Sequence, residues 1–390
     1  MHDPSVASEA AGEIRQWQQA RARLEAATAD PAHRRQAHRM LWEICQALQD
    51  PEAALAHLRA AIAEDPLFTR LRTSCQPAAR SVLLLAAPGD FQANLPLDRL
   101  FDESTDLHTL WLADPQDILR DPARFIPANL PWIDCTFIAI AEDAAHRVVL
   151  RAADALAAVI GAPVINSGAA IGQLSRAGTA ATLQDLPDAI VPSHHLVAHG
   201  TDLAVAFPVI IRPFGSHAGK GLQRLADEAA LANHYAENAS TPWFTVAHFV
   251  DYRSLDKAWR KYRVIFVAGV AYPLHLAIHD DWAIWYYNAG MHLCANKQSE
   301  EAGFLADIQA SLPQRTQAAL RELALIVGLD YFGLDCGVMP DGRLLVFEIE
   351  TGMIVHDRTS ESAARPPGDP SVPIRKALER LIDRRSLDAG

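Results

Sequence analysis

Cysteine is scarce in this sequence, and its few occurrences follow no metal-binding spacing. The five cysteines are odd in number and scattered along 390 residues, and no two of them form a Cys-x-x-Cys pair. A disulfide framework needs paired cysteines and a zinc ribbon needs them at short, regular spacings, so we expect neither. Reduced thiols, and hence a reducing compartment, are the default.

Basic residues and long apolar runs are also in short supply. Lys and Arg number 35 against 47 Asp and Glu, which gives a formal net charge of -12. Nucleic-acid-binding surfaces carry a basic stripe, so we expect no nucleic-acid partner. No apolar run reaches membrane-spanning length, and the residues after Met1 contain neither a basic n-region nor an apolar h-region. We therefore expect a cytoplasmic protein that makes no contact with a membrane.

The N-terminal part of the chain has a helical pattern. Half of all residues are hydrophobic, which allows two or three domains with cores of their own. Within residues 1–78 apolar positions recur at helical spacing, and Asp50-Pro51 is typical of a helix start. The stretch 51–66 resembles the second helix of a tetratricopeptide repeat, although no clear second copy follows. We expect either an ordinary three-helix subdomain or a module that docks a protein or peptide partner.

Residues 79–165 alternate between short strand runs and a helical pattern. Apolar runs at 81–87, 107–112 and 135–141 precede a helical pattern over 144–160, and this alternation predicts an open parallel sheet. No Gly-x-Gly-x-x-Gly follows the first strand, so the dinucleotide fingerprint is absent. We expect an α/β domain.

A connector is expected over residues 166–206, with one helix near 170–183. His194, His195 and His199 cluster there. They lack a carboxylate or cysteine at ligand spacing, and a His-x-x-x-His pair alone is weak evidence for zinc. We interpret them as surface or linker histidines.

A glycine-rich hairpin is predicted at residues 207–225. Three glycines between its strands let the backbone approach a ligand closely: Gly215, Gly219 and Gly221. Free N–H groups, Ser216 and Lys220 would meet phosphate oxygens. The loop is not a Walker A motif, because its spacing is one residue short and no Ser or Thr follows the lysine. A plain hairpin with a glycine turn is the alternative.

A second hairpin is predicted at residues 331–350. The dipeptide Asp341-Gly342 suits a two-residue type I′ turn, and counting back from it places Asp335 opposite Glu348. Side chains alternate along a strand, so Glu350 shares the face of Glu348. Three carboxylates this close repel one another unless a cation compensates them, and oxygen ligands without His or Cys suit Mg²⁺.

The surroundings of these carboxylates favour a buried site. Both strands carry apolar runs on both faces, which is typical of a central sheet strand and not of an exposed hairpin whose acids face water. Gly333 and Gly337 are expected to leave open space beside Asp335. A metal site is the preferred interpretation.

The two hairpins, with the Arg-containing strand in 260–278 between them, resemble the ATP-grasp superfamily. The resemblance covers residues 160–357, and the predicted sheet at 80–165 is similar to the α/β domain that precedes the module in that family. Residues 260–278 resemble bacterial proteins that join tetratricopeptide-like helices to an ATP-grasp module. The resemblance implies an α/β protein, α+β in its C-terminal module, with antiparallel sheets and a glycine-loop lid. The implied segments are helices at 1–78, the α/β domain at 79–165, and the ATP-grasp domain at 166–390 with its lid at about 200–250.

The resemblance also implies ligands for ATP. Arg212 stands where the family places a basic residue against the α-phosphate, and Arg176 stands near the place of its other phosphate-binding lysine. Residues 245–251 match the hinge strand whose backbone pairs with adenine; there His248 replaces the usual glutamate, and Asp251 would bind the ribose. The implied ATP-binding residues are Arg176, Arg212, Ser216, His217, Gly219, Lys220, Gly221, His248, Phe249, Val250 and Asp251.

Catalytic and metal-binding roles follow from the same resemblance. Arg263, together with Lys220, would stabilise charge on the transferring γ-phosphate. Asp335, Glu348 and Glu350 would hold Mg²⁺, or Mn²⁺ in its place. Glu350 departs from the usual asparagine, which leaves the number of metal ions open.

A substrate wall is expected after the central strands. His275 should face the cleft, and Tyr286 and Asn288 lie in the aromatic-polar stretch 279–288. An aromatic run at alternating spacing is equally typical of a core.

The resemblance implies an ATP-dependent carboxylate–amine ligase that forms an amide or peptide bond through an acylphosphate. No Ser-His or Cys-His arrangement suggests a covalent nucleophile. A kinase of the same superfamily and a nucleotide-binding interaction protein remain as alternatives. The substrates would be small-molecule or peptide carboxylates and amines, and a homodimer is expected only by analogy.

Overall fold

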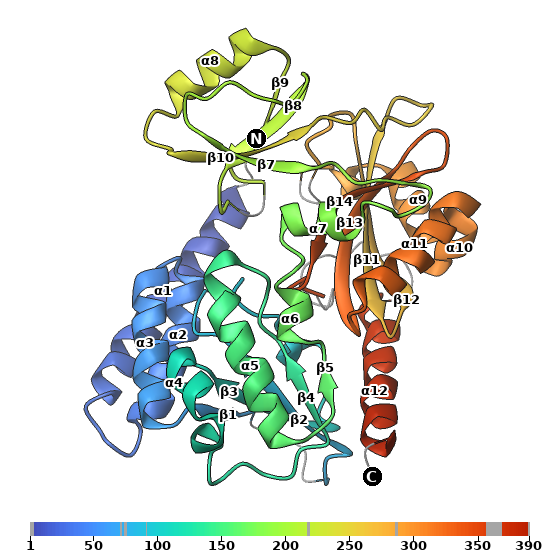
Figure 1. The fold of residues 1–390 in the computed structure, drawn as a ribbon. Helices are drawn as coiled ribbons and strands as arrows, with labels where there is room; N and C mark the ends of the chain where they lie inside the picture. The colour runs from blue at the N-terminus through green and yellow to red at the C-terminus, as the bar shows by residue number, and fades with distance from the viewer. Residues whose placement is uncertain are drawn as a thin grey trace. The chain divides into compact units, whose positions relative to one another are not determined.

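The chain divides into two compact units. The computed structural model describes residues 4–70, 72–73, 76–90, 92–216, 219–284, 288–355 and 369–388, with side chains other than those of residues 4–13 and 99. The first unit contains residues 1–172 and 382–390, and the second contains residues 173–381 (Figure 1).

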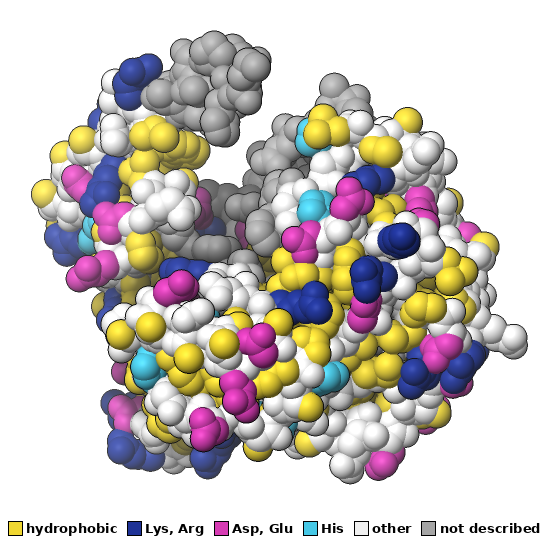
Figure 2. Space-filling view, turned by 90° about the horizontal axis from the view of Figure 1, so that it is seen from above, with side chains coloured by type: hydrophobic (Ala, Val, Ile, Leu, Met, Phe, Trp, Pro, Cys, Tyr) yellow, Lys and Arg dark blue, Asp and Glu magenta, His cyan; other side chains and the backbone are white. Residues whose placement is uncertain are grey.

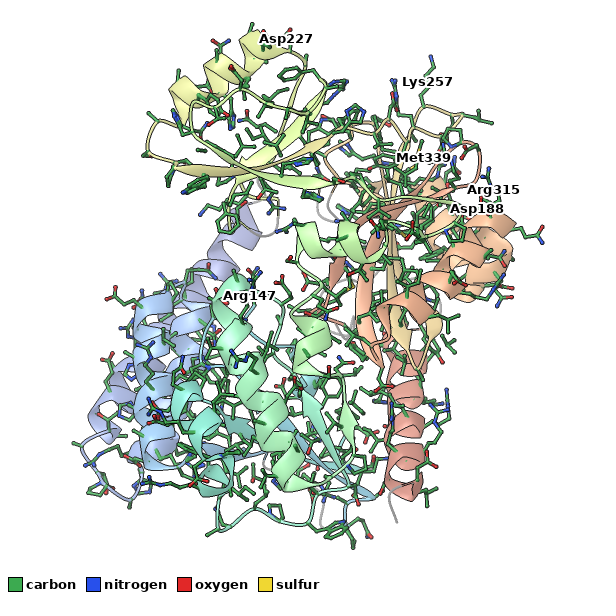
Figure 3. All side chains as sticks on the ribbon, viewed as in Figure 1. Arg147, Asp188, Asp227, Lys257, Arg315 and Met339 are labelled. Carbon is green, nitrogen blue, oxygen red and sulfur yellow. The ribbon has the colours of Figure 1, made fainter. Side chains whose placement is uncertain are left out.

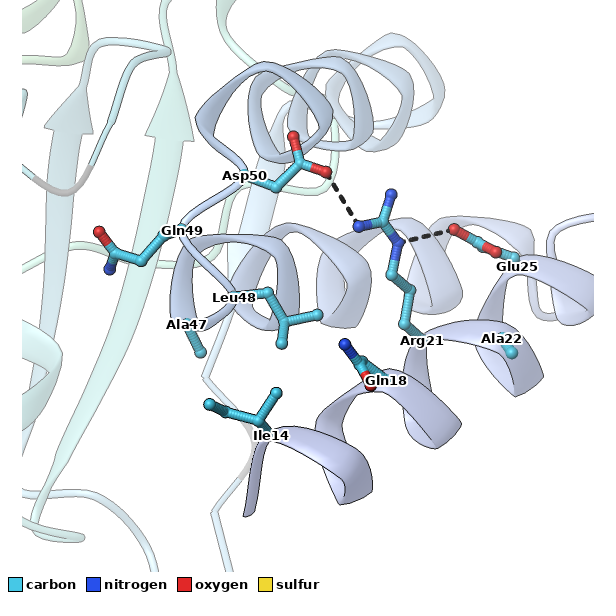
Figure 4. Close-up of a pocket in the computed structure, with 9 residues that line it drawn as sticks. All are labelled: Ile14, Gln18, Arg21, Ala22, Glu25, Ala47, Leu48, Gln49 and Asp50. Atoms are coloured by element: carbon cyan, nitrogen blue, oxygen red, sulfur yellow. Dashed lines mark hydrogen bonds and ion pairs between the residues drawn. The ribbon is translucent and has the colours of Figure 1, made fainter. Parts of the chain in front are cut away.

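Three helices open the first unit: α1 (Pro4–Ala27), α2 (Arg34–Ala47) and α3 (Pro51–Glu64). The predicted start of α3 is confirmed, because Asp50 accepts a hydrogen bond from the Ala53 amide at 3.2 Å and Pro51 takes the first helical position. A pocket of about 380 Å³ lies between α1 and the segment joining α2 to α3. Figure 4 shows Arg21 over this pocket, bonded to both Glu25 and Asp50.

The first unit also contains a five-stranded sheet of order β1-β3-β2-β4-β5. Its strands are β1 (Leu67–Thr69), β2 (Arg80–Ala86), β3 (Thr105–Trp111), β4 (Cys135–Ile138) and β5 (Val164–Ile165). Strands β2 to β5 are parallel, as predicted, but β1 is an antiparallel edge strand that was not predicted. Three residues are too few to show a strand period.

The helices and the sheet of this unit share a core. Leu58 and Ile62 of α3 cluster with Phe68 of β1 and Trp111 of β3, and Trp42 of α2 packs against them. The other helical elements of the unit are η1 (Leu97–Arg99), α4 (Pro115–Arg120), η2 (Pro122–Phe125), η3 (Ala144–His146), α5 (Arg147–Ile160) and α6 (Gly168–Ile171).

The second unit begins with α7 (Arg176–Thr182) and contains an antiparallel sheet of order β7-β10-β8-β9. Its strands are β7 (His194–Ala198), β8 (Val209–Pro213), β9 (Gln223–Leu225) and β10 (Trp243–His248), and α8 (Glu228–Glu237) follows β9. The predicted glycine-rich hairpin is confirmed as β8, its loop and β9. From the sequence we interpret these histidines as surface or linker residues: His195 is exposed, as a surface residue would be, but neither His194 nor His195 lies in a linker, because both are on β7 and pair with β10.

A five-stranded sheet of order β12-β11-β13-β14-β6 forms the rest of the second unit. Its strands are β6 (Ala189–Ile190), β11 (Trp259–Val267), β12 (Val270–His279), β13 (Tyr331–Val338) and β14 (Leu344–Glu350). Helices α9 and α11 pack against it (Figure 1). The helices are η4 (Met291–Leu293), α9 (Ala295–Ala306), α10 (Ile308–Ser311), α11 (Gln314–Val327) and α12 (Ser371–Asp388), whose last turns belong to the first unit.

Aromatic packing and an exposed ion pair contribute to holding this sheet. The rings of Phe266 on β11 and Phe332 on β13 stack with centroids 4.5 Å apart. At the β6 edge, Arg315 of α11 binds the Asp188 carboxylate at 2.6 Å, and Figure 3 labels this pair. The ion pair ties the single parallel strand to the helix that packs on the sheet.

The turn of the carboxylate hairpin (β13–β14, residues 331–350) is one residue longer than the predicted two-residue turn. The amide of Met339 donates to the Arg343 carbonyl, so the loop has three residues and Gly342 takes a φ of 84°. This shifts the register by one residue, and a bulge between Asp335 and Cys336 shifts it back. Asp335 therefore does pair with Glu348, as predicted, although by two irregularities that cancel.

Surface charge is mixed on the face seen in Figure 2. Among the described side chains of that face, Lys and Arg alternate with Asp and Glu and form no continuous basic stripe. Within the described part of the chain, no helix combines the length and the apolarity needed to cross a bilayer.

Candidate functional site

One face of the five-stranded sheet gathers opposite charges from neighbouring strands. Arg263 of β11 pairs directly with Asp335 of β13, and Lys261 lies two residues earlier on the same face. The Arg263 guanidinium binds Asp335 twice, with Nε–Oδ1 at 2.7 Å and Nη2–Oδ2 at 2.9 Å. The Lys261 ammonium lies 2.6 Å from Asp335 Oδ2. Both oxygens of this carboxylate therefore contact a cation.

Asp335 is the most deeply placed charge of the group. Its side chain is 1% exposed, so leaving it unpaired would be very costly. Burial raises its pKa, but the charges of Arg263 and Lys261 outweigh burial and hold the pKa well below its usual range. Asp335 is ionised throughout the physiological range.

The two glutamates of β14 lie beside this pair. Glu348 accepts a hydrogen bond from Arg176 Nη2 at 2.8 Å, and Arg176 stands at the first position of α7. Burial raises the pKa of Glu348, but the Arg176 charge helps to bring it below its usual value. Burial and the charge of Glu348 raise the pKa of Glu350 to about 7. The sequence-predicted residues Arg176, Glu348 and Glu350 thus lie with Asp335 at one site.

The two glycines of β13 do not leave open space, as the sequence suggested. A Cβ atom on Gly333 would lie 2.4 Å from the Met353 sulfur, and one on Gly337 would lie 2.9 Å from the Tyr252 ring. Both glycines instead admit neighbouring side chains that cover the strand next to Asp335. The expectation of an empty space is therefore wrong.

Sequence reasoning missed Lys261. A signal was present, because Lys261 and Arg263 are two residues apart on one strand and their side chains must therefore share a face. What the sequence did not show was the register between β11 and β13, which places that face against Asp335.

The glycine hairpin (β8, its loop and β9, residues 209–225) presents a second group of polar side chains. Arg212 Nε donates to Ser216 Oγ at 2.9 Å, and its Nη2 donates to the Ser216 carbonyl. Lys220 is exposed, and Gly219 and Gly221 have positive φ angles of 72° and 69°. Ser216 and Arg212 therefore lie together, as the predicted phosphate site requires, whereas His217 lies outside the described residues.

The charge of Arg176 on α7 affects two groups at the sheet of the glycine hairpin, Arg212 and His194. Burial, together with the charge of Arg176, lowers the pKa of Arg212 to about 10, so the side chain still carries its charge at neutral pH. Burial and the same arginine lower the pKa of His194 to about 4. His194 is therefore a neutral group beside two arginines, and the sequence reasoning missed it because β7 was read as a linker.

In the predicted adenine-binding stretch, residues 245–251, several polar groups already have hydrogen-bond partners within the protein. Strand β10 ends at His248, whose Nδ1 lies 3.0 Å from the Ala206 carbonyl. The amide of Phe249 donates to the Pro208 carbonyl at 2.9 Å, so this N–H is already bonded. Val250 is half-buried. Asp251 binds Arg253, with Nε–Oδ1 at 3.0 Å.

The predicted substrate residues are separated. His275 of β12 pairs with Arg263 of β11 and thus reaches the charged face. Asn288 donates from its side chain to the Ala283 carbonyl at 2.8 Å. Tyr286 lies outside the described residues.

The carboxylates offer part of a metal site. Among the described residues, no three His, Cys, Asp or Glu side chains are arranged to hold a metal ion. Asp335 is occupied by cations, whereas Glu348 and Glu350 lie on one face with only one oxygen each in a described hydrogen bond. Two carboxylate oxygens suit Mg²⁺, which takes its other ligands from water and phosphate. The donor set therefore fits one such ion.

The sequence matches no known protein family and no curated protein. Solved structures do match. D-alanine–D-alanine ligase from Bacillus anthracis, complexed with ATP, has 12% identity and a TM-score of 0.46, and the match covers 80% of this chain and 98% of that one. An ATP-grasp RimK domain protein from Sphaerobacter thermophilus has 15% identity and a TM-score of 0.42, with 79% and 98% covered. The ATP-grasp ligase PsnB, complexed with minimal precursor, Mg and ADP, has 14% identity and a TM-score of 0.42, with 80% and 100% covered. All three TM-scores lie below 0.5, so we base the function on the site itself.

Proposed function

We propose that this chain is an ATP- and Mg²⁺-dependent ligase of the ATP-grasp type, which joins a carboxylate to an amine. One observation carries the proposal: Lys261 and Arg263 neutralise the buried Asp335 on the sheet face that also holds the Arg176–Glu348 pair. Charged groups fixed in this way before the reaction are what phosphoryl transfer requires, because catalysis there is mainly positioning and electrostatic stabilisation.

The nucleotide would lie between the two hairpins of the second unit. Arg176, Arg212 and Lys220 would bind its phosphates, with Ser216 and the loop amides donating further hydrogen bonds. Residues 248–251 would receive the adenine and ribose. The Arg212–Ser216 bond supports this assignment, because it holds the arginine next to the glycine loop.

The chemistry would proceed in two steps. A carboxylate oxygen of the substrate attacks the γ-phosphorus, the bond to the β-phosphate oxygen breaks, and ADP leaves. The amine then attacks the carbonyl carbon of the acylphosphate, inorganic phosphate leaves, and the amine proton passes to phosphate or water. Arg263 would stabilise the charge that develops in both steps. Mg²⁺ would supply charge neutralisation and alignment of the phosphates.

The substrates would be small-molecule or peptide carboxylates and amines. His275 lies across from Arg263 and is the residue best placed to contact the acid. A test is Mg²⁺-ATP turnover against pools of amino acids, dipeptides and small dicarboxylates, comparing the wild type with Asp335→Ala. ADP and phosphate release that needs two co-substrates supports a ligase, and ADP release with a single phosphorylated hydroxyl product would make it a kinase.

The N-terminal helices support a second proposal, docking of a protein or peptide partner through a tetratricopeptide-like surface. Its support is the pocket of about 380 Å³ over which Arg21 is held by Glu25 and Asp50 (Figure 4). Partner binding that survives Asp335→Ala, in a chain without turnover, would make docking the main function.

A further inference from the structure

The contacts of Asp335 leave it little capacity to bind a metal ion. Arg263 takes both carboxylate oxygens, and Lys261 adds a second contact to Oδ2 at 2.6 Å. The carboxylate is 1% exposed, so replacing these cations by a metal would require moving two charged side chains within a packed sheet face. Asp335 is satisfied by the protein itself.

The formal charges of the face are balanced without any metal. Asp335, Glu348 and Glu350 carry three negative charges when ionised, and Lys261, Arg263 and Arg176 carry three positive charges. Three carboxylates alone would need more than one divalent ion for neutrality. With the three cations in place, one divalent ion already gives the face a net positive charge that suits a polyphosphate.

The two glutamates differ from Asp335 in having oxygens available. Glu348 uses Oε2 for Arg176, and Glu350 uses Oε1 to accept from the Gly352 amide at 3.1 Å. Among the described contacts the other oxygen of each glutamate has no partner. Residues two apart on a strand point to the same side, so Glu348 and Glu350 present their carboxylates on one face.

We propose that Lys261 is a built-in cation that replaces a divalent ion at Asp335, so that this face binds a single metal ion through Glu348 and Glu350. Asp335 then acts as an anchor for Lys261 and Arg263. The proposal rests on the proposed ligase function. Glu350 in place of asparagine left the number of metal ions open, and the proposal sets that number at one.

The test counts bound Mn²⁺ on the full chain by electron paramagnetic resonance, with the metal alone as probe. The wild type should bind one Mn²⁺, and Glu350→Gln and Glu348→Gln should each weaken binding about tenfold or more. Lys261→Met should tighten Mn²⁺ binding about tenfold or more, because a positive charge next to the site is removed. Lys376→Met, at an exposed lysine of α12, is the matched control and should leave binding unchanged.

A charge-balanced double variant tests whether Asp335 is a metal ligand or only an anchor for Lys261 and Arg263. Lys261→Met with Asp335→Asn removes one charge of each sign, so it should fold and should keep wild-type Mn²⁺ affinity if Asp335 is not a ligand. Two bound Mn²⁺ in the wild type, or a loss of tenfold or more in the double variant, would overturn the proposal. ATP binding is measured separately on the same samples, so its absence would contradict the proposed ligase function without altering the Mn²⁺ result.

Discussion

The two hairpins of the second unit hold their charged side chains in opposite ways. In the carboxylate hairpin, Asp335 is buried and bound by two cations. In the glycine hairpin, Lys220 is exposed and has no partner among the described contacts. A buried charge must be paired within the fold, whereas an exposed charge stays hydrated until a ligand arrives. The first hairpin is therefore organised before any ligand binds, whereas in the second we propose that Lys220 is paired only when a ligand is bound.

The largest effect is expected where the buried pairing is broken. Asp335→Ala removes the buried carboxylate that both Lys261 and Arg263 bind, which should lower the free energy of unfolding by about 3 kcal/mol and abolish ATP turnover. Urea denaturation and ADP release measure the two effects. Asp341→Ala, at the exposed turn of the same hairpin, is the control and should keep both properties. Unchanged stability of Asp335→Ala would mean that the ion pairs do not form in solution.

The opposite pattern is expected in the glycine hairpin. Lys220→Met should leave the melting temperature unchanged but weaken ATP binding about tenfold or more, because a charge-assisted hydrogen bond to phosphate is lost. Isothermal titration with ATP measures the affinity, and Lys376→Met again serves as the control. A large loss of stability in Lys220→Met would remove the distinction between the two hairpins.

Close packing of the carboxylate hairpin predicts a smaller effect. Gly333→Ala would place a Cβ 2.4 Å from the sulfur and 2.5 Å from the Cβ of Met353, so it should destabilise the fold by about 1–3 kcal/mol. In the background of Met353→Gly, which removes both the sulfur and the Cβ, the same change should cost much less, and a double-mutant cycle measures the difference. Equal costs in both backgrounds would show that the two residues are not in contact.

The smallest effect at neutral pH concerns His194, on the sheet of the glycine hairpin. Its pKa is about 4 in the folded state against an ordinary 6.5, so the unfolded chain binds the proton more readily. Its contribution to stability is therefore present above about pH 6.5 and lost as the pH falls towards 4, by at most about 1.4 kcal/mol per pH unit. His194→Gln should lose less stability than the wild type over this window, with the exposed His195→Gln as control. Parallel pH profiles of His194→Gln and wild type would contradict the burial of His194.

Local patterns predicted the two hairpins of the second unit, but the register between strands distant in sequence determined the site. The glycine hairpin and the pairing of Asp335 with Glu348 could be read from turn residues and alternation. The three-residue loop and the compensating bulge could not, because either alone would have placed Asp335 opposite another residue. Lys261 was missed for the same reason, since its partner is 74 residues away in the chain, at Asp335.

Other misses arose where side chains act on neighbours remote in sequence. Met353 and Tyr252 fill the places next to Gly333 and Gly337, and nothing in a single sequence indicates which side chain will cover a glycine. The strand β1 was too short for a periodic signal and is defined only by its pairing with β3. Tertiary contacts, not propensity, decide such positions.

The most direct test of the account is a crystal structure of the chain with ADP and Mn²⁺, using the anomalous signal of the metal. We predict one Mn²⁺ bound by Glu348 and Glu350, nucleotide phosphates in contact with Lys220 and Arg212, and Asp335 still bound to Lys261 and Arg263. A nucleotide bound elsewhere, or crystals that take up neither ADP nor Mn²⁺ at this face, would contradict the assignment of the site and of the ligase function.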